Sequence, residues 1–533
     1  MFFDRAVLLD VFPEKYYTDA YDIVNIFYNG VINRCSRKSG AAEPARIIAS
    51  PEVLGEDYIS VSCAENGFSI DIHFYARGGH FPDSGDGAPE NRVCKSGNGT
   101  RAKAGAAYIE GKPIAYSFKI SLYHLLKTQA RSERQITQSL PWGALVGVRP
   151  IKLYVDQLEK GISQPAIIED MARIYDVPEK TSALCLRIAT AQIPVLNAYN
   201  HANDCILYIG VPFCVSKCAY CSFPSDAHNK IEIYERSYMD ALLNEIGFIA
   251  DHLNEEKRGI KAIYIGGGTP TALSARELER LIGGIRDFFT RDYPDEITVE
   301  AGRADTITRE KLAIIHKAAR IVNRFRLCIN PQTMNDRTLR LIGRAHSPED
   351  VVKAFWLARD MGFDDINMDI IAGLPGEDKN AFAETLEAIS FLKPESLTSH
   401  TLCIKRSSRF NEFDDEYIYP DAEETGEMQE AARVFAARMG MAPYYLYRQK
   451  NTIGNLANVG YAVKGCECAY NIHEMADRID VYAAGAGAVS KFVCAGTGSV
   501  ERVFNVKNLL EYISRNDEMI ERKRRYLTLR RKE

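Results

Sequence analysis

Short apolar runs alternate with amphipathic segments through the middle of the chain. The runs are ILYIGV, AIYIGG, ITVEAG, FRLCIN, INMDIIAGL and SLTSHTLCI, between residues 206 and 404. After the first run, Tyr234, Tyr238 and Leu242 fall on one helical face. After the second, SARELERLIGGIRDFF repeats this period, and its Ser274 is a good N-cap. Alternating strands and helices form a parallel sheet with right-handed crossovers, so the pattern predicts an α/β fold whose sheet is open or curled into a partial barrel.

Changes in this pattern divide the chain into four predicted regions. Residues 1–145 form an N-terminal α+β region, with strands in RAVLLDVF, YISVSCA and FSIDIHFYA and a polar, glycine-rich insertion near 78–107 that we expect to be mobile. Residues 146–204 form a helical connector, with helices in GVRPIKLYVDQLEKG and PEKTSALCLRIATAQIPVLNAY. The β/α units occupy 205–410. A C-terminal α+β extension, 411–533, covers the active-site side and ends in a basic, solvated tail.

Composition narrows the class of protein and its partners. A hydrophobic content of 46% and a charged content of 26% are typical of a soluble globular protein. The net charge of −5 provides no basic field for nucleic acid or anionic lipid. No apolar run reaches the roughly 18–20 residues of a membrane span. The N-terminal segment MFFDRAVLLDVF is interrupted by charges and is a poor signal peptide, so we expect a cytoplasmic protein.

Residues that could bind a ligand or take part in catalysis follow the predicted strands. They are Cys214, Cys218 and Cys221 after the first strand, GGGTP (266–270) after the second, Glu300 and Arg303 after the third, Gln332 after the fourth, Asp369 in the fifth, and residues 403–406 after the sixth. The carboxyl ends of parallel strands meet at one edge, where ligands bind, so a ligand site is expected there. GGGTP alone is equally typical of a tight β–α turn. A buried Asp369 needs either a ligand or a partner, such as a neighbouring arginine.

The segment CVSKCAYC is the densest group among 13 cysteines. Structural zinc takes four ligands, commonly as two separated pairs, whereas this is a single triplet. A [4Fe–4S] cube held by three thiolates keeps one iron open, as a catalytic metal does. Chemistry alone favours a cluster and leaves zinc, or buried or redox thiols, as alternatives. The pair Cys466 and Cys468 has no second pair nearby, and the isolated cysteines are expected to be small buried side chains.

The triplet spacing, with an aromatic residue before the last cysteine, resembles the motif of radical SAM enzymes. YIGVPFCVSKCAYCSF, YIGGGTPT, VEAGR, INPQTMNDRTLRLIGRAH and INMDIIAGLPGED resemble motifs of the oxygen-independent coproporphyrinogen III oxidase group. VGVRPIKLY, PYYLYRQKN and GAGAVSK are similar to its coproporphyrinogen dehydrogenase (HemZ-type) branch. The resemblance runs from about residue 145 to 495. It implies a radical SAM partial (β/α)6 barrel that holds a [4Fe–4S] cluster and one or two S-adenosylmethionine (SAM) molecules.

The same resemblance implies individual roles. Cys214, Cys218 and Cys221 would bind the cluster, whose open iron is chelated by SAM. Tyr208, Gly267 and Glu300 would contact that first SAM. The positions that match a second SAM site are Tyr220, Gly268, Thr269, Gln332, Arg344 and Asp369. Cys403 falls on another such position, but its residue type differs from that of the family.

The implied reaction is the oxidative decarboxylation of coproporphyrinogen III to protoporphyrinogen IX without oxygen. It requires a reductant for the cluster and an electron acceptor. A tetracarboxylate substrate needs cations around the site, and arginine suits it best. The candidates are Arg303, Lys405, Arg406, Arg409 and Arg448.

Other proteins of this fold provide alternatives. Related haem chaperones carry a His-Asn…Tyr-Trp motif where this chain has GNLANVGYA, so Gly454 and Val459 replace the histidine and the tryptophan. Without that imidazole, haem ligation by this route is disfavoured. A haem-directed radical SAM methyltransferase would use the same cluster and cofactor residues, and a structural zinc protein is a third alternative.

Overall fold

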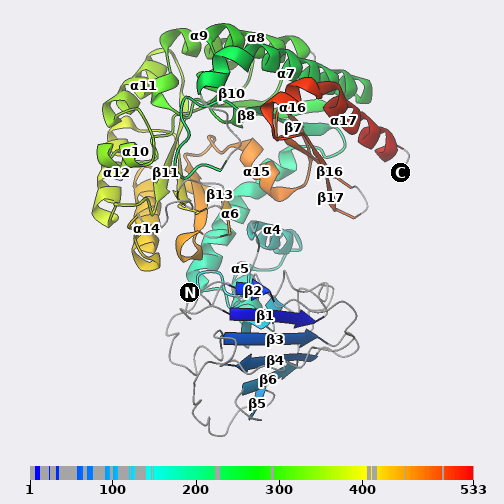
Figure 1. Ribbon diagram of the computed structural model, residues 1–533, viewed down its shortest axis with the longest axis vertical. Helices are drawn as coiled ribbons and strands as arrows, with labels where there is room; N and C mark the ends of the chain where they lie inside the picture. Colours follow the sequence, from blue (N-terminus) through cyan, green and yellow to red (C-terminus); the bar gives the residue numbers. More distant parts are fainter. Residues whose placement is uncertain are drawn as a thin grey trace. The chain divides into compact units, whose positions relative to one another are not determined.

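The computed structural model describes most of the chain after residue 139 and the strands before it. The described residues are 140–145, 147, 149–222, 228–289, 293–404, 410, 417–450, 452–494 and 497–531, together with six N-terminal strands and a few helical positions. The chain divides into two compact units (Figure 1). One comprises Met1–Gly147 and Ile162–Ala183, and the other comprises Val148–Gly161 and Leu184–Glu533.

The first unit contains a six-stranded sheet in the order β2-β1-β3-β4-β6-β5. Its strands are β1 (Val7–Phe12), β2 (Ile32–Arg34), β3 (Asp57–Cys63), β4 (Ser69–Tyr75), β5 (Asn91–Lys95) and β6 (Thr100–Gly105). The three predicted strands are present as β1, β3 and β4. β5 and β6 pair as an antiparallel hairpin inside the predicted glycine-rich insertion. The segment RAKA in β6 alternates charged and small residues, a strand period that its polar composition obscured.

Three helices follow in the sequence, and two of them were predicted. They are α4 (Ile151–Glu159), α5 (Gln164–Tyr175) and α6 (Glu179–Ala198). The unpredicted helix α5 begins after Ser163, with a proline in its first turn, and ends at the left-handed Asp176. These are ordinary helix start and stop signals.

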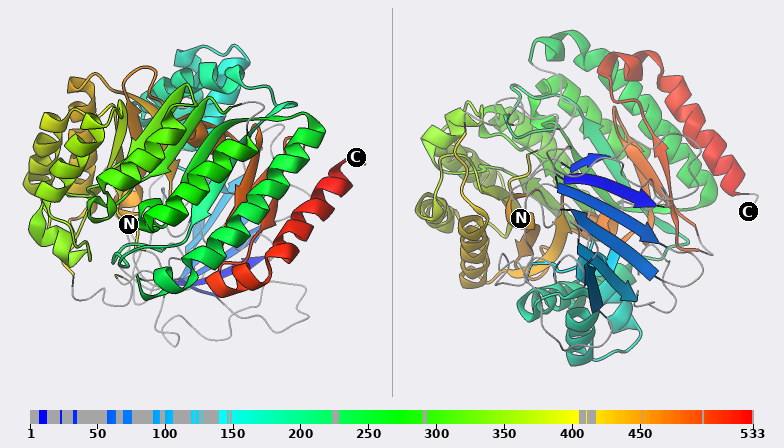
Figure 2. Two further views of the ribbon diagram at one scale, coloured as in Figure 1. Left: turned by 90° about the horizontal axis from the view of Figure 1, so that it is seen from above. Right: turned by 60° about the horizontal axis from the view of Figure 1, so that its bottom comes forward.

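The second unit is built on an eleven-stranded sheet in the order β13-β14-β12-β11-β10-β9-β8-β7-β15-β16-β17. All six predicted central strands are present: β7 (Asp204–Val211), β8 (Gly259–Gly267), β9 (Glu296–Glu300), β10 (Arg324–Cys328), β11 (Asp365–Ala372) and β12 (Ser396–Thr401). These six strands are parallel and lie in chain order. The sheet is curved but not closed (Figure 2). This confirms the predicted α/β fold with an open, curved parallel sheet.

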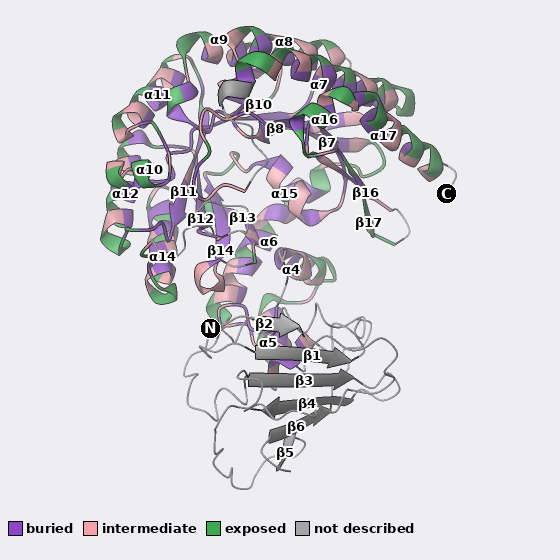
Figure 3. Cartoon of the chain, viewed as in Figure 1, coloured by how far each residue is buried: buried purple, intermediate pink, exposed green. Residues whose placement is uncertain are grey.

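Helices connect these strands along the outer side of the sheet (Figure 1). They are α7 (His228–Glu256), α8 (Ala275–Phe288), α9 (Arg309–Ala319), α10 (Asp336–Leu341), α11 (Pro348–Asp360) and α12 (Lys379–Leu392). Ser274 caps α8 as predicted, because its side chain accepts a hydrogen bond from the Glu277 amide. The central strands are buried almost throughout (Figure 3), which explains their continuous apolar runs.

The C-terminal extension continues the sheet at both edges. Its elements are α14 (Ala422–Arg438), β13 (Ala442–Arg448), β14 (Ala457–Ala462), α15 (Ala469–Ala476), β15 (Asp480–Ala484), β16 (Val489–Val493), β17 (Val500–Phe504), α16 (Leu509–Ser514) and α17 (Asn516–Arg530). β14 pairs antiparallel with β12, whereas β15 returns to lie parallel to β7 at the opposite edge. None of the helices that the structure describes has the length and hydrophobicity required to span a bilayer.

Candidate active site

A cavity of about 760 Å³ lies at the carboxyl ends of the central strands in the second unit. Every residue for which the sequence predicts a role with the cluster or SAM is part of its wall. These residues are Cys214, Cys218, Cys221, Tyr208, Tyr220, Gly267, Gly268, Thr269, Glu300, Gln332, Arg344 and Asp369. Cys403 also lines the cavity. Residues separated by up to about 200 positions in the sequence therefore line one cavity.

The three cysteines lie in the loop that follows β7, and all three are free thiols. The Sγ of Cys214 lies 3.4 Å from the Thr269 hydroxyl, and the Sγ of Cys218 accepts a hydrogen bond from Nη1 of Arg303 at 3.7 Å. In the described part of the chain, no three His, Cys, Asp or Glu side chains converge on a single metal ion. A cubic cluster does not require this, because each thiolate binds a different iron. Three soft sulfur donors beside a cation therefore fit an anionic iron–sulfur cluster.

The GGGTP turn packs directly against the start of the cysteine loop. The amide of Gly268 donates to the Val211 carbonyl, and the amide of Thr269 donates to the Phe213 carbonyl, both at 2.7 Å. A Cβ at position 268 would lie 2.9 Å from the carbonyl carbon of Phe213 and closer still to its oxygen. Gly267 has a φ of +104°, which only glycine adopts without strain. The glycines are therefore required by this close packing.

Two carboxylates face the cavity in different environments. Glu300 accepts hydrogen bonds from the hydroxyl of Tyr264 and from the amide of Asn330, the latter at 2.9 Å. Its burial, together with the nearby charge of Asp369, raises the pKa of Glu300 to about 7.

Asp369 is held in the anionic form by its neighbours. Nδ2 of Asn367 donates to Oδ1 of Asp369 at 2.7 Å, and Nε2 of His400 lies 3.6 Å from Oδ2. Burial acts in the opposite direction, but hydrogen bonds and charge from His400 keep the pKa of Asp369 below its ordinary value. The partners of this half-buried carboxylate are therefore a histidine and an asparagine, and not the arginine considered in the sequence analysis. His400 is itself within 3.2 Å of the Tyr447 hydroxyl.

Arg344 and Gln332 shape the opposite part of the wall. Arg344 donates to the carbonyls of Gly302 and Asn330 at 2.8 and 2.9 Å, and to the hydroxyl of Tyr220 at 2.8 Å. Gln332 is a non-glycine residue with a φ of +68°, and its amide donates to the Asp369 carbonyl at 2.9 Å. Among the described residues, Oε1 of Gln332 and Nε of Arg344 are buried without a hydrogen-bond partner. Unsatisfied buried atoms in a cavity wall are suited to a polar ligand.

The structure places the cationic residues that were predicted to bind the substrate in different environments. Arg303 lines the cavity, but its guanidinium already donates to Asp305, to Ser216 and to the thiol of Cys218. Arg448 is buried outside the cavity wall and donates to Asn455. The other candidates, Lys405, Arg406 and Arg409, lie outside the described residues.

Several residues of the cavity wall were not predicted from the sequence. They include Tyr264, His400, Tyr447, Tyr470, Lys491, Arg502 and Phe504. His400 had a usable signal, because it is a polar residue in an otherwise buried parallel strand. Tyr447 reaches the cavity because β13 pairs with β14 and β14 pairs with β12, whereas Lys491, Arg502 and Phe504 follow the return of β15 beside β7.

Cys466 and Cys468 lie just before the N-terminus of α15, which Glu296 caps. Glu296 accepts hydrogen bonds from the Ala469 and Tyr470 amides at 2.9 and 3.2 Å and so caps the N-terminus of α15. The thiol of Cys468 also donates to Glu296, at 3.3 Å. Within the described ranges this pair joins no group of potential metal ligands.

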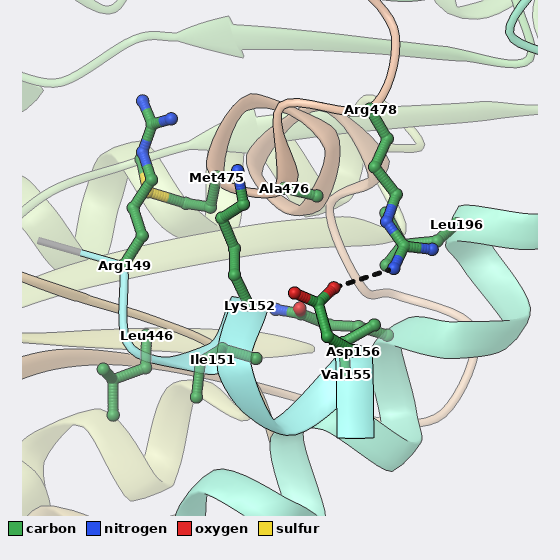
Figure 4. Close-up of a pocket in the computed structure, with 11 residues that line it drawn as sticks. Arg149, Ile151, Lys152, Val155, Asp156, Leu196, Leu446, Met475, Ala476 and Arg478 are labelled. Carbon is green, nitrogen blue, oxygen red and sulfur yellow. Dashed lines mark ion pairs between the residues drawn. The ribbon is translucent and has the colours of Figure 1, made fainter. Parts of the chain in front are cut away.

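A second cavity, beside α4, has a volume of only about 20 Å³ (Figure 4). Arg149 of the GVRP segment forms an ion pair with Asp477, and Arg478 forms one with Asp156 at 3.7 Å. This volume holds about one water molecule. The GVRP arginine therefore joins α4 to the end of α15 and is not part of a ligand site.

Comparison with known proteins identifies relatives that cover from half to about three quarters of the chain. The model of the radical SAM superfamily matches residues 208–389. The chain is 38% identical over 414 residues to the oxygen-independent coproporphyrinogen-III oxidase-like protein HemZ of Bacillus subtilis, covering 76% of this chain and 80% of that protein. It is 30% identical over 268 residues to the heme chaperone HemW of Escherichia coli, covering 50% of this chain and 65% of that protein. The solved structure of E. coli coproporphyrinogen III oxidase, HemN, aligns with a TM-score of 0.47 and 21% identity, covering 62% of this chain and 73% of that one.

Proposed function

We propose that this chain, which belongs to the HemZ-like group of the radical SAM superfamily, converts coproporphyrinogen III to protoporphyrinogen IX without oxygen. The observation that carries the proposal is the convergence of the cysteine triplet, the GGGTP turn and the Glu300–Asp369 pair in one cavity of about 760 Å³. The 38% identity to a coproporphyrinogen-III oxidase-like protein supports the choice of substrate.

Membership of the superfamily implies a [4Fe–4S] cluster and SAM. Cys214, Cys218 and Cys221 would hold the cluster, which when reduced would supply the electron for reductive cleavage of SAM. Gly267 allows close approach of a ligand to the backbone, and the carboxylate of Glu300 provides acceptors for ribose hydroxyls or a charge beside the sulfonium. The unsatisfied atoms of Gln332 and Arg344 would serve a second polar ligand on the opposite wall.

The overall reaction defines what the cavity has to accommodate. At each of two propionates, one C–H bond and one C–C bond break, a C=C bond forms and carbon dioxide leaves. One hydrogen atom would leave with the fragment cleaved from SAM, and one electron would pass to an external acceptor. A radical must also be shielded from solvent. Tyr208, Tyr264 and Tyr470 form an aromatic cluster in the wall, with the last two ring centroids 4.7 Å apart, and would exclude water.

The test is an anaerobic assay with reduced protein, SAM, an electron acceptor and coproporphyrinogen III. We expect a tricarboxylate intermediate and then a dicarboxylate product by chromatography, together with 5′-deoxyadenosine. Cleavage of SAM with all four carboxylates retained would contradict the proposal. A methylated tetrapyrrole would indicate a methyltransferase instead.

A haem chaperone is the second candidate, because HemW proteins are among the relatives. The positions that correspond to the histidine and tryptophan of the chaperone motif hold Gly454 and Val459. Gly454 has a φ of +61°, and a Cβ there would lie 3.0 Å from that of Ala422, while Val459 is buried in β14. We therefore expect no stoichiometric haem binding at submicromolar concentration. A sharp one-to-one Soret titration would favour the chaperone.

A further inference from the structure

The β16–β17 hairpin presents one face to the cavity and the other to the core. Val489, Lys491, Arg502 and Phe504 all line the cavity. The intervening Ser490, Phe492 and Val503 are buried on the opposite side. Because strand side chains alternate with a period of two, the four cavity residues form one continuous surface, which we call the hairpin face.

Cross-strand pairing divides the hairpin face into a cationic and an apolar layer. Lys491 lies directly opposite Arg502, and Val489 lies directly opposite Phe504. Like charges in opposed positions destabilise a sheet. Lys491 is compensated, since it pairs with Glu474 and lies 3.9 Å from Asp477. Arg502 is exposed and, within the described part of the chain, has no carboxylate partner.

The other arginines of the cavity wall are already engaged. Arg303 is bound by Asp305, Arg326 donates to Asn367 at 2.7 Å, and Arg344 donates to backbone carbonyls. Arg502 differs from these three arginines because it is exposed and no described residue pairs with its guanidinium, which is therefore available to an anion. Phe504, two residues further along β17, is 55% exposed and so adds an apolar surface beside Arg502.

We propose that the hairpin face binds the tetrapyrrole, with Phe504 and Val489 against the macrocycle and Arg502 paired with a propionate carboxylate. A macrocycle with carboxylates at its periphery matches an apolar layer beside a cationic one. This inference rests on the proposed function, because it assigns the substrate to the same cavity.

The test uses the fluorescence of coproporphyrin III, the oxidised form of the substrate, to measure equilibrium binding to the full chain. Its tetramethyl ester serves as a second ligand without carboxylates. Arg502→Gln should weaken binding of coproporphyrin III about tenfold to a hundredfold and leave binding of the ester unchanged, since a hydrogen bond to a charged group is lost. Phe504→Ala should weaken binding of both ligands, because it removes contact with the macrocycle.

Two further variants test whether weaker binding is specific to the guanidinium of Arg502 or follows from any loss of an arginine. Arg525→Gln changes an exposed arginine of α17 that pairs with Glu521, and it should bind coproporphyrin III as the wild type does. Arg502→Lys keeps the charge but not the bidentate geometry, and it should fall between the wild type and Arg502→Gln. The unfolding temperature of ligand-free Arg502→Gln should not decrease, because the change removes a like-charge pair.

The outcomes separate this inference from the proposed function. If Arg502→Gln binds coproporphyrin III as tightly as the wild type, or weakens both ligands equally, the hairpin face does not bind a propionate. If the wild type decarboxylates coproporphyrinogen III under either result, the proposed function still holds. Carboxylate-dependent binding through Arg502 without any decarboxylation would support the inference and contradict the proposed function.

Discussion

Glu300 and Asp369 face the same cavity, yet their proton affinities are shifted in opposite directions. The pKa of Glu300 is raised to about 7 by burial and by the charge of Asp369. If the Glu300 anion binds SAM, affinity should increase as the pH rises from about 6 to about 8, because the neutral acid gives way to the carboxylate. Equilibrium binding of SAM to reconstituted protein measures this, and Glu300→Gln should abolish the pH dependence. An equal pH dependence in the variant would assign it to another group.

The stability of the ligand-free protein should show the opposite pH dependence to the binding of SAM, and so provides a control. Between the ordinary pKa of 4.5 and about 7, the folded state binds more protons at Glu300 than the unfolded state does. The free energy of unfolding should therefore fall as the pH rises through this window, and less so in Glu300→Gln. Glu279→Gln, at an exposed ion pair with Lys317, should retain the wild-type pH dependence in denaturant titrations.

Cys218 tests the position of the cluster. Anaerobically reconstituted protein should contain about four irons per chain, the content of one [4Fe–4S] cluster. Cys218→Ala should lose most of this iron and all reductive cleavage of SAM, because it removes one of three thiolates. Cys466→Ala is the matched control, since that thiol lies outside the cavity wall, and it should keep its iron. Iron retained in Cys218→Ala but lost in Cys466→Ala would relocate the cluster.

At the scale of elements, the predicted and the observed strands agree where the local sequence pattern determines the strand. β7, β8 and β11 were predictable because each is a largely apolar run, the pattern of a parallel sheet buried on both faces. The residues at their carboxyl ends then follow from topology. In contrast, β15 lies beside β7 through a pairing between residues almost 280 positions apart. Neither Arg502 nor Phe504 could be assigned to the site, because no local pattern encodes that pairing.

The turn after β8 permits a matched pair of glycine substitutions. Gly268→Ala would place a Cβ within 3.0 Å of the Phe213 backbone, so β7 and the turn must separate. We expect a loss of stability of about 1–3 kcal/mol, typical of overpacking, and weakened binding of SAM. Gly283→Ala lies inside α8, where a Cβ meets nothing within 4 Å. It should stabilise the protein by up to about 1 kcal/mol. Denaturant unfolding of both variants measures the difference, and equal effects would contradict the packing argument.

At the scale of the molecule, a buried ion pair joins the end of the chain to the cavity wall. Lys523 of α17 donates to Glu245 of α7 at 2.5 Å, and both side chains are buried. Glu245 also accepts hydrogen bonds from the Gly485 amide at 2.9 Å and from the Tyr512 hydroxyl at 2.5 Å. Gly485 begins the short loop between β15 and β16, and Gly487, two residues later in the same loop, lines the cavity. The last helix therefore supports the loop that leads into the hairpin face.

Lys523→Met tests this support. It leaves the Glu245 charge buried without its cation, which typically costs about 3–5 kcal/mol of stability. The double variant Glu245→Gln/Lys523→Met removes both charges and should recover part of that loss, giving a favourable coupling energy in a double-mutant cycle. Arg525→Met, at an exposed position of the same helix, should change stability by less than about 1 kcal/mol. Because the perturbed loop leads into the hairpin face, Lys523→Met should also bind coproporphyrin III more weakly under conditions where it remains folded. Additive losses in the cycle would show that the two charges do not act as a pair, and unchanged ligand binding in folded Lys523→Met would separate α17 from the site.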